Sequence, residues 1–336
     1  MDASGKPTTR LAPSPTGALH LGNARTFLVN WLLARQRGWR IILRVEDLDG
    51  PRIKRGADVQ AIEDLRWLGI DWDGQPLHQS QRLAHYRAAV ERLLARGLAY
   101  PCTCSRREVD LAASAPHAED GAAIYPGTCR GRWTSVEEAQ RAAGRRPALR
   151  FAVQSEQEKG GHSCLIRRSV PLFPLEFADE FAGRHTFDAA SQLGDFVIAK
   201  ADGTPAYQLA VVVDDAAMGI THVVRGDDLL DSTPRQMLLY GALGLERAIP
   251  SYCHLPLVVG QDGRRLAKRH GDTRLSSYRA AGISAGRVLS LLGRWCGVEA
   301  PEPRCAADLL ERFDLARVPR QPIVFTADSE RFLRAG

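Results

Sequence analysis

The sequence predicts an α/β protein with a mostly parallel sheet. Apolar residues recur at helical spacing over 24–37, and the next segment, 41–45, is a short and largely apolar run that is typical of a buried strand. The same alternation of helical and extended patterns returns after residue 190. Strands that alternate with helices along a chain usually pair in parallel, because each helix returns the chain to the starting edge of the sheet.

The first hundred residues contain one predicted strand among three predicted helices. The helix over 24–37 ends at Gly38, and the strand is followed at once by the acidic pair Glu46 and Asp47. The expected elements are a strand at 41–45 and helices at 24–37, 57–68 and 80–97.

The character of the sequence changes near residue 101, where Cys, Pro, Gly and Ala become frequent. Farther along, short strands are expected at 148–153, 165–169, 196–199, 207–213 and 221–224, and helices at 234–243, 284–296 and 305–313. We therefore divide the chain into the first half of an α/β domain, an insert, the second half of that domain and a helical extension. These parts are residues 1–100, 101–190, 191–275 and 276–336.

Charge and hydropathy exclude a membrane protein and are compatible with a polyanionic partner. The chain has 45 Lys and Arg against 39 Asp and Glu, a formal net charge of +6, and only five of the cations are Lys. A mildly basic surface suits RNA, although an Arg-rich solvated surface is the simpler explanation. No apolar run approaches the roughly 18 residues that span a bilayer, and no secretory signal is visible, so we expect a soluble cytoplasmic protein.

Three of the seven cysteines form a candidate zinc site. Cys102 and Cys104 are separated by one residue, and Cys129 follows 25 residues later. An odd cysteine count without a secretion signal argues against disulfides, and the four scattered cysteines are expected in the core. Structural zinc takes about four ligands, so a fourth is needed. Ligand frequencies favour His117; the alternative is three unpaired cysteines in a core.

Residues 13–23 form the first candidate site for a ligand. Pro and Gly mark a tight turn, which leads into the helix that begins near Ala24. The start of a helix offers backbone N–H groups and partial positive charge to an anion. His20 and Asn23 can donate hydrogen bonds to phosphate, and Gly22 permits close approach, although a lone His at a helix start is usually structural.

Residues 263–271 form a basic loop bounded by glycines, which in isolation would be interpreted as a solvated turn. Together with residues 20–23 this loop resembles the paired signatures of class I aminoacyl-tRNA synthetases. The sequence His-Leu-Gly-Asn at 20–23 is similar to their HIGH motif, and 266–270 is similar to their KMSKS loop. The resemblance implies a Rossmann-like catalytic domain.

Further segments resemble the glutamyl branch of that family. They are residues 44–49, 71–73, 79–82, 211–215, 224–228 and 233–236. Only 65 residues follow Gly271, which is too few for the anticodon-binding region of a full glutamyl-tRNA synthetase. The chain therefore resembles the truncated paralogous family, the glutamyl-queuosine tRNA(Asp) synthetases. That resemblance implies one structural Zn²⁺ per chain, with Tyr125 in place of His117 as the fourth ligand beside Cys102, Cys104 and Cys129.

The resemblance also implies the roles of individual residues. Glutamate would contact Arg10, Ser14, Glu46, Tyr207 and Arg225, with Glu46 on the ammonium and Arg225 on the side-chain carboxylate. ATP, with Mg²⁺ on its phosphates, would contact Arg10, Leu11, Ala12, Pro13, Ser14, His20, Gly22, Asn23 and Lys268. His20, Asn23 and Lys268 would act in catalysis. The alternative for Glu46 and Arg225 is a structural ion pair.

The implied reaction is attack of a glutamate carboxylate on the α-phosphorus of ATP, followed by transfer of glutamate to queuosine in the anticodon of tRNA(Asp), by a monomeric enzyme. Three alternatives stay open: a compact glutamyl-tRNA synthetase acting on tRNA(Glu), a nucleotidyltransferase with a small-molecule acceptor, and an inactive RNA-binding module. Ala267 stands where the family often has Ser, which predicts weaker use of ATP because one phosphate contact is lost.

Overall fold

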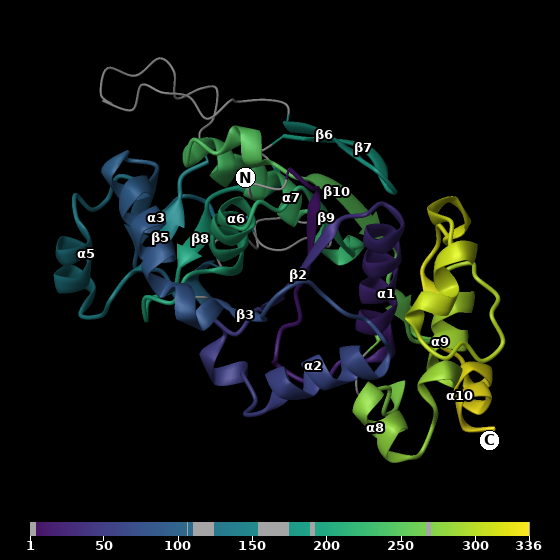
Figure 1. The fold of residues 1–336 in the computed structure, drawn as a ribbon. Coiled ribbons are helices and arrows are strands. Elements are labelled where there is room, and N and C mark those ends of the chain that lie inside the picture. Colours follow the sequence, from purple (N-terminus) through teal and green to yellow (C-terminus); the bar gives the residue numbers. More distant parts are fainter. Residues whose placement is uncertain are drawn as a thin grey trace.

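The computed structural model describes residues 5–105, 107–109, 124–153, 175–188, 192–266 and 270–335. Figure 1 shows the chain as an α/β body with helices on both sides of its central strands. The predicted strand at 165–169 and the alternative zinc ligand His117 lie outside the described residues. Among the helices that are described, none has the length and apolar character needed to cross a membrane.

Parallel strands from two distant parts of the chain form the centre of the fold. β1 (Thr8–Leu11), β2 (Arg40–Val45) and β3 (Leu77–His78) pair in parallel, as do β6 (Leu175–Asp179), β10 (Ser251–Leu255) and β9 (His222–Gly226). β7 (Gly183–Phe187) adds an antiparallel edge to the second group. Thr8 and Thr221 join the two groups, because the amide of Thr221 donates to the Thr8 carbonyl over 2.8 Å. β1 and β9 therefore lie at the point where the chain order reverses, which is where open α/β sheets bind ligands.

Helix α1 (Leu21–Gln36) is buried between the sheet and the C-terminal elements. Its apolar residues share one core with α9 (Ala285–Arg294) and with the 3₁₀ helix Ala306–Arg312. Figure 1 shows α9 beside it, and α10 (Ala327–Arg334) packs against α9. Arg25 is fully buried within this core and donates to the carbonyls of Pro256 and Trp295. The C-terminal elements therefore support the helix that begins at His20.

A second core lies beneath an antiparallel sheet. β4 (Ala99–Cys102), β5 (Ala148–Phe151) and β8 (Phe196–Ala199) pair in that order, and α3 (Leu83–Ala95), α6 (Tyr207–Ala217) and α7 (Ser232–Ala242) pack apolar residues against them. The other α-helices and strands of the described residues are α2 (Ala57–Trp67), α5 (Val136–Ala143), α8 (Leu275–Ala280) and the short parallel pair β11 (Val258–Val259) and β12 (Ile323–Val324).

Most of the predicted elements that fall on described residues are confirmed to within a few positions. The predicted strand at 207–213 is wrong, since these residues form the first part of α6. A short apolar run does not distinguish a buried strand from a buried helix, and here the helix continues through Asp214 and Asp215 to Ala217. The segment at 305–313 is a 3₁₀ helix, not an α-helix. The four-part division of the chain stays a prediction.

Candidate active site

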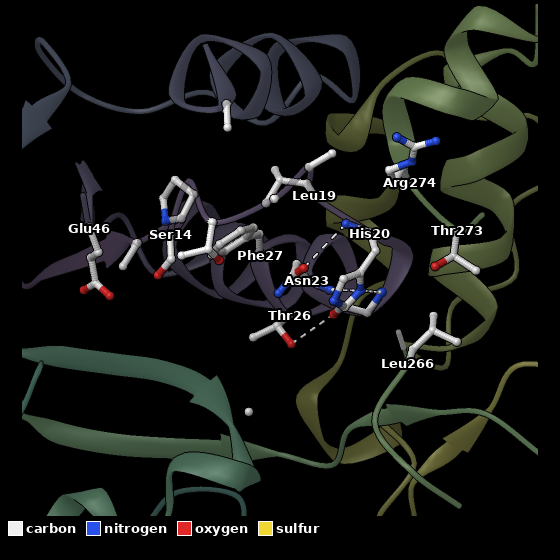
Figure 2. Close-up of a pocket in the computed structure, with 18 of the residues that line it drawn as sticks. Ser14, Leu19, His20, Asn23, Thr26, Phe27, Glu46, Leu266, Thr273 and Arg274 are labelled. Atoms are coloured by element: carbon white, nitrogen blue, oxygen red, sulfur yellow. Dashed lines mark hydrogen bonds between the residues drawn. The ribbon is translucent and has the colours of Figure 1, made fainter. Parts of the chain in front are cut away.

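A cavity of about 880 Å³ opens at the carboxyl ends of β1, β2 and β9 (Figure 2). Its wall combines residues from both halves of the parallel strands with the start of α1 and the segment 271–276. Nearly all of the predicted ligand-binding residues that the structure describes line it: Arg10, Ala12, Pro13, Ser14, His20, Gly22, Asn23, Glu46, Tyr207 and Arg225. Leu11 is the exception, because its side chain is fully buried in the core.

His20 is the N-cap of α1 and also faces the cavity. Its Nδ1 accepts hydrogen bonds from the amides of Gly22 at 3.1 Å and Asn23 at 3.4 Å. Burial, with a smaller contribution from Arg265, lowers the pKa of His20 to about 4. A neutral ring whose Nδ1 accepts must carry its proton on Nε2, so the ring retains one donor for a ligand.

The backbone at the start of α1 is less available to an anion than the sequence suggested. The amide of Leu21 donates to the Thr273 carbonyl, that of Ala24 donates to the His20 carbonyl, and His20 Nδ1 takes the two between them. All four first-turn N–H groups thus have protein partners. In this arrangement a phosphate at this end of the cavity would be bound by side chains.

Gly22 makes the position of the His20 ring possible. A Cβ added at residue 22 would lie 3.1 Å from two ring atoms of His20 and 3.5 Å from Val258. Contacts near 3.1 Å are tighter than ordinary packing, so a side chain at residue 22 would force the ring or the helix to move.

Buried charges surround the end of β2. Arg44 is fully buried and donates to Asp215 over 2.5 Å and to Glu46 over 3.1 Å. Burial alone would lower the pKa of Arg44, but Asp215 and Glu46 outweigh it and the pKa lies above its ordinary value. Burial raises the pKa of Glu46, opposed by Arg44 and Arg10. The local ion pair considered for Glu46 is therefore present, and Glu46 still lines the cavity.

Arg10 reaches the same place from β1. It is almost completely buried, donates to the Val224 carbonyl over 3.3 Å, and has its Nε 3.8 Å from Asp215. Burial lowers the pKa of Arg10, and Asp215 opposes that shift. Arg10 Nε has no hydrogen-bond partner among the described residues.

Arg225, on β9, has neutral hydrogen-bond partners only, within the described part of the chain. Its Nε donates to His254 over 2.9 Å, its Nη1 to Gln236 over 3.0 Å and its Nη2 to Thr233 over 2.8 Å. The ion pair considered for Arg225 is therefore not formed among these residues. A buried cation without an acidic partner is costly unless a ligand supplies the opposite charge.

Both ends of the basic loop border the cavity. Arg265 and Leu266 precede the centre of the loop, Gly271 follows it, and all three line the cavity. Lys268 itself lies outside the described residues. His270 contacts Asp262 across the base of the loop at 2.8 Å, and its ring lies where a side chain at Gly260 would be.

Sequence reasoning missed several residues of this wall. Lys54 and Arg55 line the cavity from the segment before α2, and the Lys54 amide donates to the Pro15 carbonyl over 3.0 Å. The available signal was the rarity of lysine in this chain. The role of Asp215 as the partner of Arg10 and Arg44 was also missed, because residues 207–213 just before it were predicted as a strand and form a helix that continues through it.

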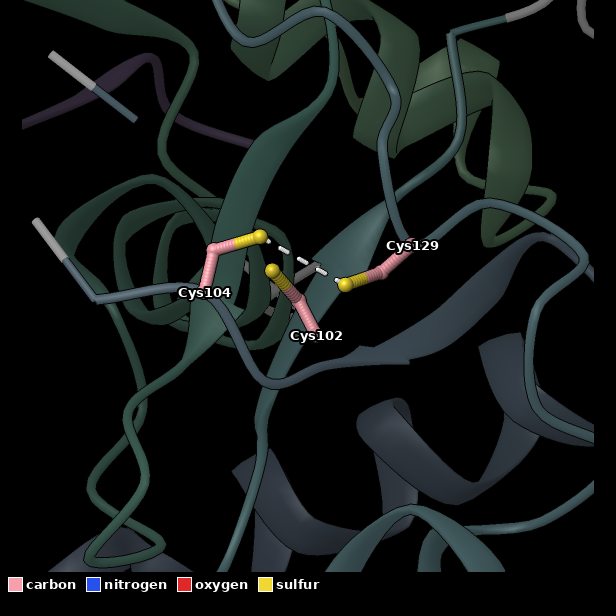
Figure 3. Close-up of side chains that lie close together, drawn as sticks. All are labelled: Cys102, Cys104 and Cys129. Atoms are coloured by element: carbon pink, nitrogen blue, oxygen red, sulfur yellow. Dashed lines mark hydrogen bonds between the residues drawn. The ribbon is translucent and has the colours of Figure 1, made fainter. Parts of the chain in front are cut away.

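The three clustered cysteines lie together at the end of β4, whose last residue is Cys102, and Figure 3 shows their side chains close together. Their sulfur atoms all lie within 4.8 Å of one another. The Tyr125 hydroxyl is 3.4 Å from the sulfur of Cys102 and 3.5 Å from that of Cys104. An ion bonded to sulfur at about 2.3 Å in tetrahedral geometry needs donors roughly 3.8 Å apart, so these four donors fit zinc.

A positively charged side chain, that of Arg150, lies next to this cluster. The Arg150 guanidinium lies 3.8 Å from the centre of the Tyr125 ring and donates to the Cys102 sulfur over 3.3 Å. Cys102, Cys129 and Tyr125 are buried, so the negative charge of metal-bound thiolates there would be only partly solvated. Arg150 would offset that charge.

The comparisons with known proteins agree with the geometry. Residues 6–311 match the model of the class I tRNA synthetases (E and Q), catalytic domain. The chain is 48% identical to the glutamyl-Q tRNA(Asp) synthetase of Symbiobacterium thermophilum, over 97% of this chain and 98% of that protein. It is 38% identical to the glutamate–tRNA ligase of Oleidesulfovibrio alaskensis, over 98% of this chain and 65% of that protein.

A solved structure is also similar. The crystal structure of a glutamate tRNA ligase from Elizabethkingia meningosepticum, in complex with its amino acid, has a TM-score of 0.76 at 27% identity, covering 98% of this chain and 68% of that one. The fold, the cavity and these matches agree, and the chain belongs to the class I tRNA synthetases of the glutamate and glutamine group.

Proposed function

We propose that this protein activates L-glutamate with ATP to glutamyl-adenylate and transfers the glutamate to queuosine in the anticodon of tRNA(Asp). The observation that carries the proposal is the single cavity that brings Arg10, Glu46 and Arg225 together with His20 and both ends of the basic loop. All of these residues belong to one chain, so we expect a monomer to be active.

Glutamate has two carboxylates and one ammonium, and the cavity offers a partner for each. Arg225 would bind the side-chain carboxylate, since its described partners are neutral and its charge needs compensation. Glu46 would accept the ammonium, and Arg10, with Ser14 and Tyr207 nearby on the wall, would orient the α-carboxylate. Glutamine lacks the negative charge that Arg225 requires, so it is expected to bind poorly.

ATP would occupy the end of the cavity near α1. A carboxylate oxygen attacks the α-phosphorus, an O–P bond forms, and the bond to the β-phosphate oxygen breaks to release pyrophosphate. This step depends on alignment and charge stabilisation more than on a base. His20 Nε2–H and the Asn23 amide would contact phosphate oxygens, Lys268 would neutralise charge on the leaving group, and Mg²⁺ enters as the complex with ATP.

The relatives support queuosine as the acceptor. Identity is higher with the glutamyl-Q tRNA(Asp) synthetase than with the glutamate–tRNA ligase, and the first match extends over nearly all of both proteins. The test is incubation with ATP, labelled glutamate and tRNA from strains with and without queuosine. We expect label on tRNA(Asp) from the queuosine-containing strain alone.

Label on tRNA(Glu) in both preparations would instead establish a compact glutamyl-tRNA synthetase. Glutamate-dependent exchange of pyrophosphate into ATP without any labelled tRNA would point to a small-molecule acceptor. Absence of that exchange would leave an inactive RNA-binding module.

We further propose that Cys102, Cys104, Cys129 and Tyr125 bind one structural Zn²⁺, which would connect β4 to the segment 124–133. We expect about one zinc per chain in the purified protein. Tyr125→Phe removes one ligand atom and is expected to weaken zinc binding at least about tenfold in a competition with a chromogenic chelator, whereas Tyr207→Phe should not. A zinc-free protein, or unchanged affinity in Tyr125→Phe, would contradict this assignment.

A further inference from the structure

Arg225 stands at one end of a line of buried side chains that crosses three neighbouring strands. Asp179 is the last residue of β6, His254 lies on β10 and Arg225 lies on β9; Figure 1 shows these strands side by side. His254 Nδ1 is 2.6 Å from Asp179 Oδ2, and Arg225 Nε is 2.9 Å from His254 Nε2. The side chains of Asp179 and His254 are fully buried.

The direction of each hydrogen bond in this line is fixed. Asp179 accepts from the amides of Phe181, Ala182 and His254, so it serves as an ionised acceptor. Burial lowers the pKa of His254, although Asp179 opposes the shift, and a neutral ring has one donor and one acceptor nitrogen. Nδ1 donates to Asp179, which leaves the Nε2 lone pair for Arg225.

The line also determines which N–H groups of Arg225 remain for a ligand. Nε is bound by His254, and Gln236 and Thr233 each take one N–H from a terminal nitrogen. A guanidinium carries two N–H groups on each terminal nitrogen, so one remains on Nη1 and one on Nη2. One N–H on each of the two terminal nitrogens can bind the two oxygens of one carboxylate.

We propose that Asp179 and His254 are positioning residues, which hold Arg225 so that its two remaining N–H groups face the side-chain carboxylate of the amino acid. The proposal rests on the proposed role of Arg225 in glutamate binding and adds two residues that do not line the cavity. It assigns the choice of glutamate over glutamine to the hydrogen-bonded line as well as to the charge of Arg225.

Two substitutions of His254 separate positioning from general stability. The amide of Asn occupies the place of Nδ1, so His254→Asn keeps the donor to Asp179 and loses the acceptor for Arg225. The amide of Gln reaches the place of Nε2, so His254→Gln keeps that acceptor. A hydrogen bond to a charged group is worth about 10- to 100-fold in affinity, so the two variants should differ by that order.

The measurement is glutamate-dependent exchange of pyrophosphate into ATP, with glutamine as the competing substrate. For His254→Asn we expect the KM for glutamate to rise at least about tenfold, with kcat and the KM for ATP within about threefold of wild type and a lower ratio of kcat/KM for glutamate over glutamine. His254→Gln keeps the acceptor for Arg225 but loses the donor to Asp179, so its KM for glutamate should rise only about threefold, well below the rise in His254→Asn. Asp179→Asn leaves a neutral acceptor for Nδ1 and should raise that KM by a similar amount, and His85→Asn on the exposed face of α3 is the control.

Equal KM values in His254→Asn and wild type would overturn the inference, as would parallel losses of kcat, ATP affinity and melting temperature in both His254 variants. A wild-type protein without glutamate-dependent exchange would instead overturn the proposed function. The two failures are therefore distinguishable.

Discussion

Three buried arginines show how one residue type takes different roles within a single site. The positive charge of Arg44 is balanced by the carboxylates of Asp215 and Glu46. Arg10 also faces Asp215, at the longer distance of 3.8 Å. The hydrogen-bond partners of Arg225 among the described residues are all neutral. A compensated guanidinium contributes to structure, whereas an uncompensated one attracts an anion. The partners therefore indicate which arginine selects the ligand.

The substitution Arg225→Lys tests whether Arg225 binds the side-chain carboxylate of glutamate. The ammonium keeps the charge but cannot present two parallel donors to a carboxylate, so we expect the KM for glutamate to rise about 10- to 100-fold. Glutamate-dependent pyrophosphate exchange measures it, and Arg184→Lys on the exposed edge of β7 is the control. A KM within about threefold of wild type would show that Arg225 does not bind the substrate.

At the scale of single elements, the N-terminal end of α1 combines capping with ligand binding. His20 satisfies two backbone amides with Nδ1, and Gly22 leaves room for its ring. The same ring faces the cavity. Stability and activity are therefore coupled at this residue.

Because His20 titrates, this coupling predicts that the free energy of unfolding depends on pH. The pKa of His20 falls from 6.5 to about 4 on folding, so between these values the unfolded chain binds the proton more readily. The free energy of unfolding should therefore fall as pH drops from 7 to 4.5, by about 2 kcal/mol from this residue. His20→Asn keeps a good cap without titrating, so urea unfolding at both pH values should show a smaller difference than in wild type or His85→Asn. An unchanged difference would contradict the assignment.

Helix α6 contributes Asp215, whose carboxylate faces an arginine on β1 and another on β2. Asp215 is buried and faces both Arg44 and Arg10. Asp215→Asn leaves these cations without their shared carboxylate, and loss of one partner from a buried pair costs about 3 to 5 kcal/mol. Urea denaturation measures the loss. Asp328→Asn, whose acid is exposed beside Arg331, should change stability by less than about 0.5 kcal/mol; similar values for the two variants would contradict this account.

At the scale of the whole molecule, the sequence predicts the order of elements better than their partners. Periodicity located α1, β2, α2 and β8, because each has a clear apolar pattern and a defined end. It failed at α6, where the uninterrupted apolar run 209–213 of a largely buried helix gives no helical periodicity. Ten of the residues that line the cavity were predicted through the resemblance, since they lie in recognisable motifs.

The remaining parts of the site depend on contacts between distant segments, which no local pattern reports. The hydrogen-bonded line through Asp179 and His254 joins strands 75 residues apart in the chain. The supporting carbonyls around Arg25 come from residues 231 and 270 positions away. Such partners emerge only when the strands and the C-terminal elements are assembled.

The central claim is that one cavity binds glutamate and ATP with defined partners. A crystal structure with a non-hydrolysable glutamyl-adenylate analogue tests it most directly. The account predicts the side-chain carboxylate about 2.8 Å from both terminal nitrogens of Arg225, the ammonium at Glu46 and the phosphate mimic beside His20. An analogue bound elsewhere, or with its nucleotide at Arg225, would contradict it.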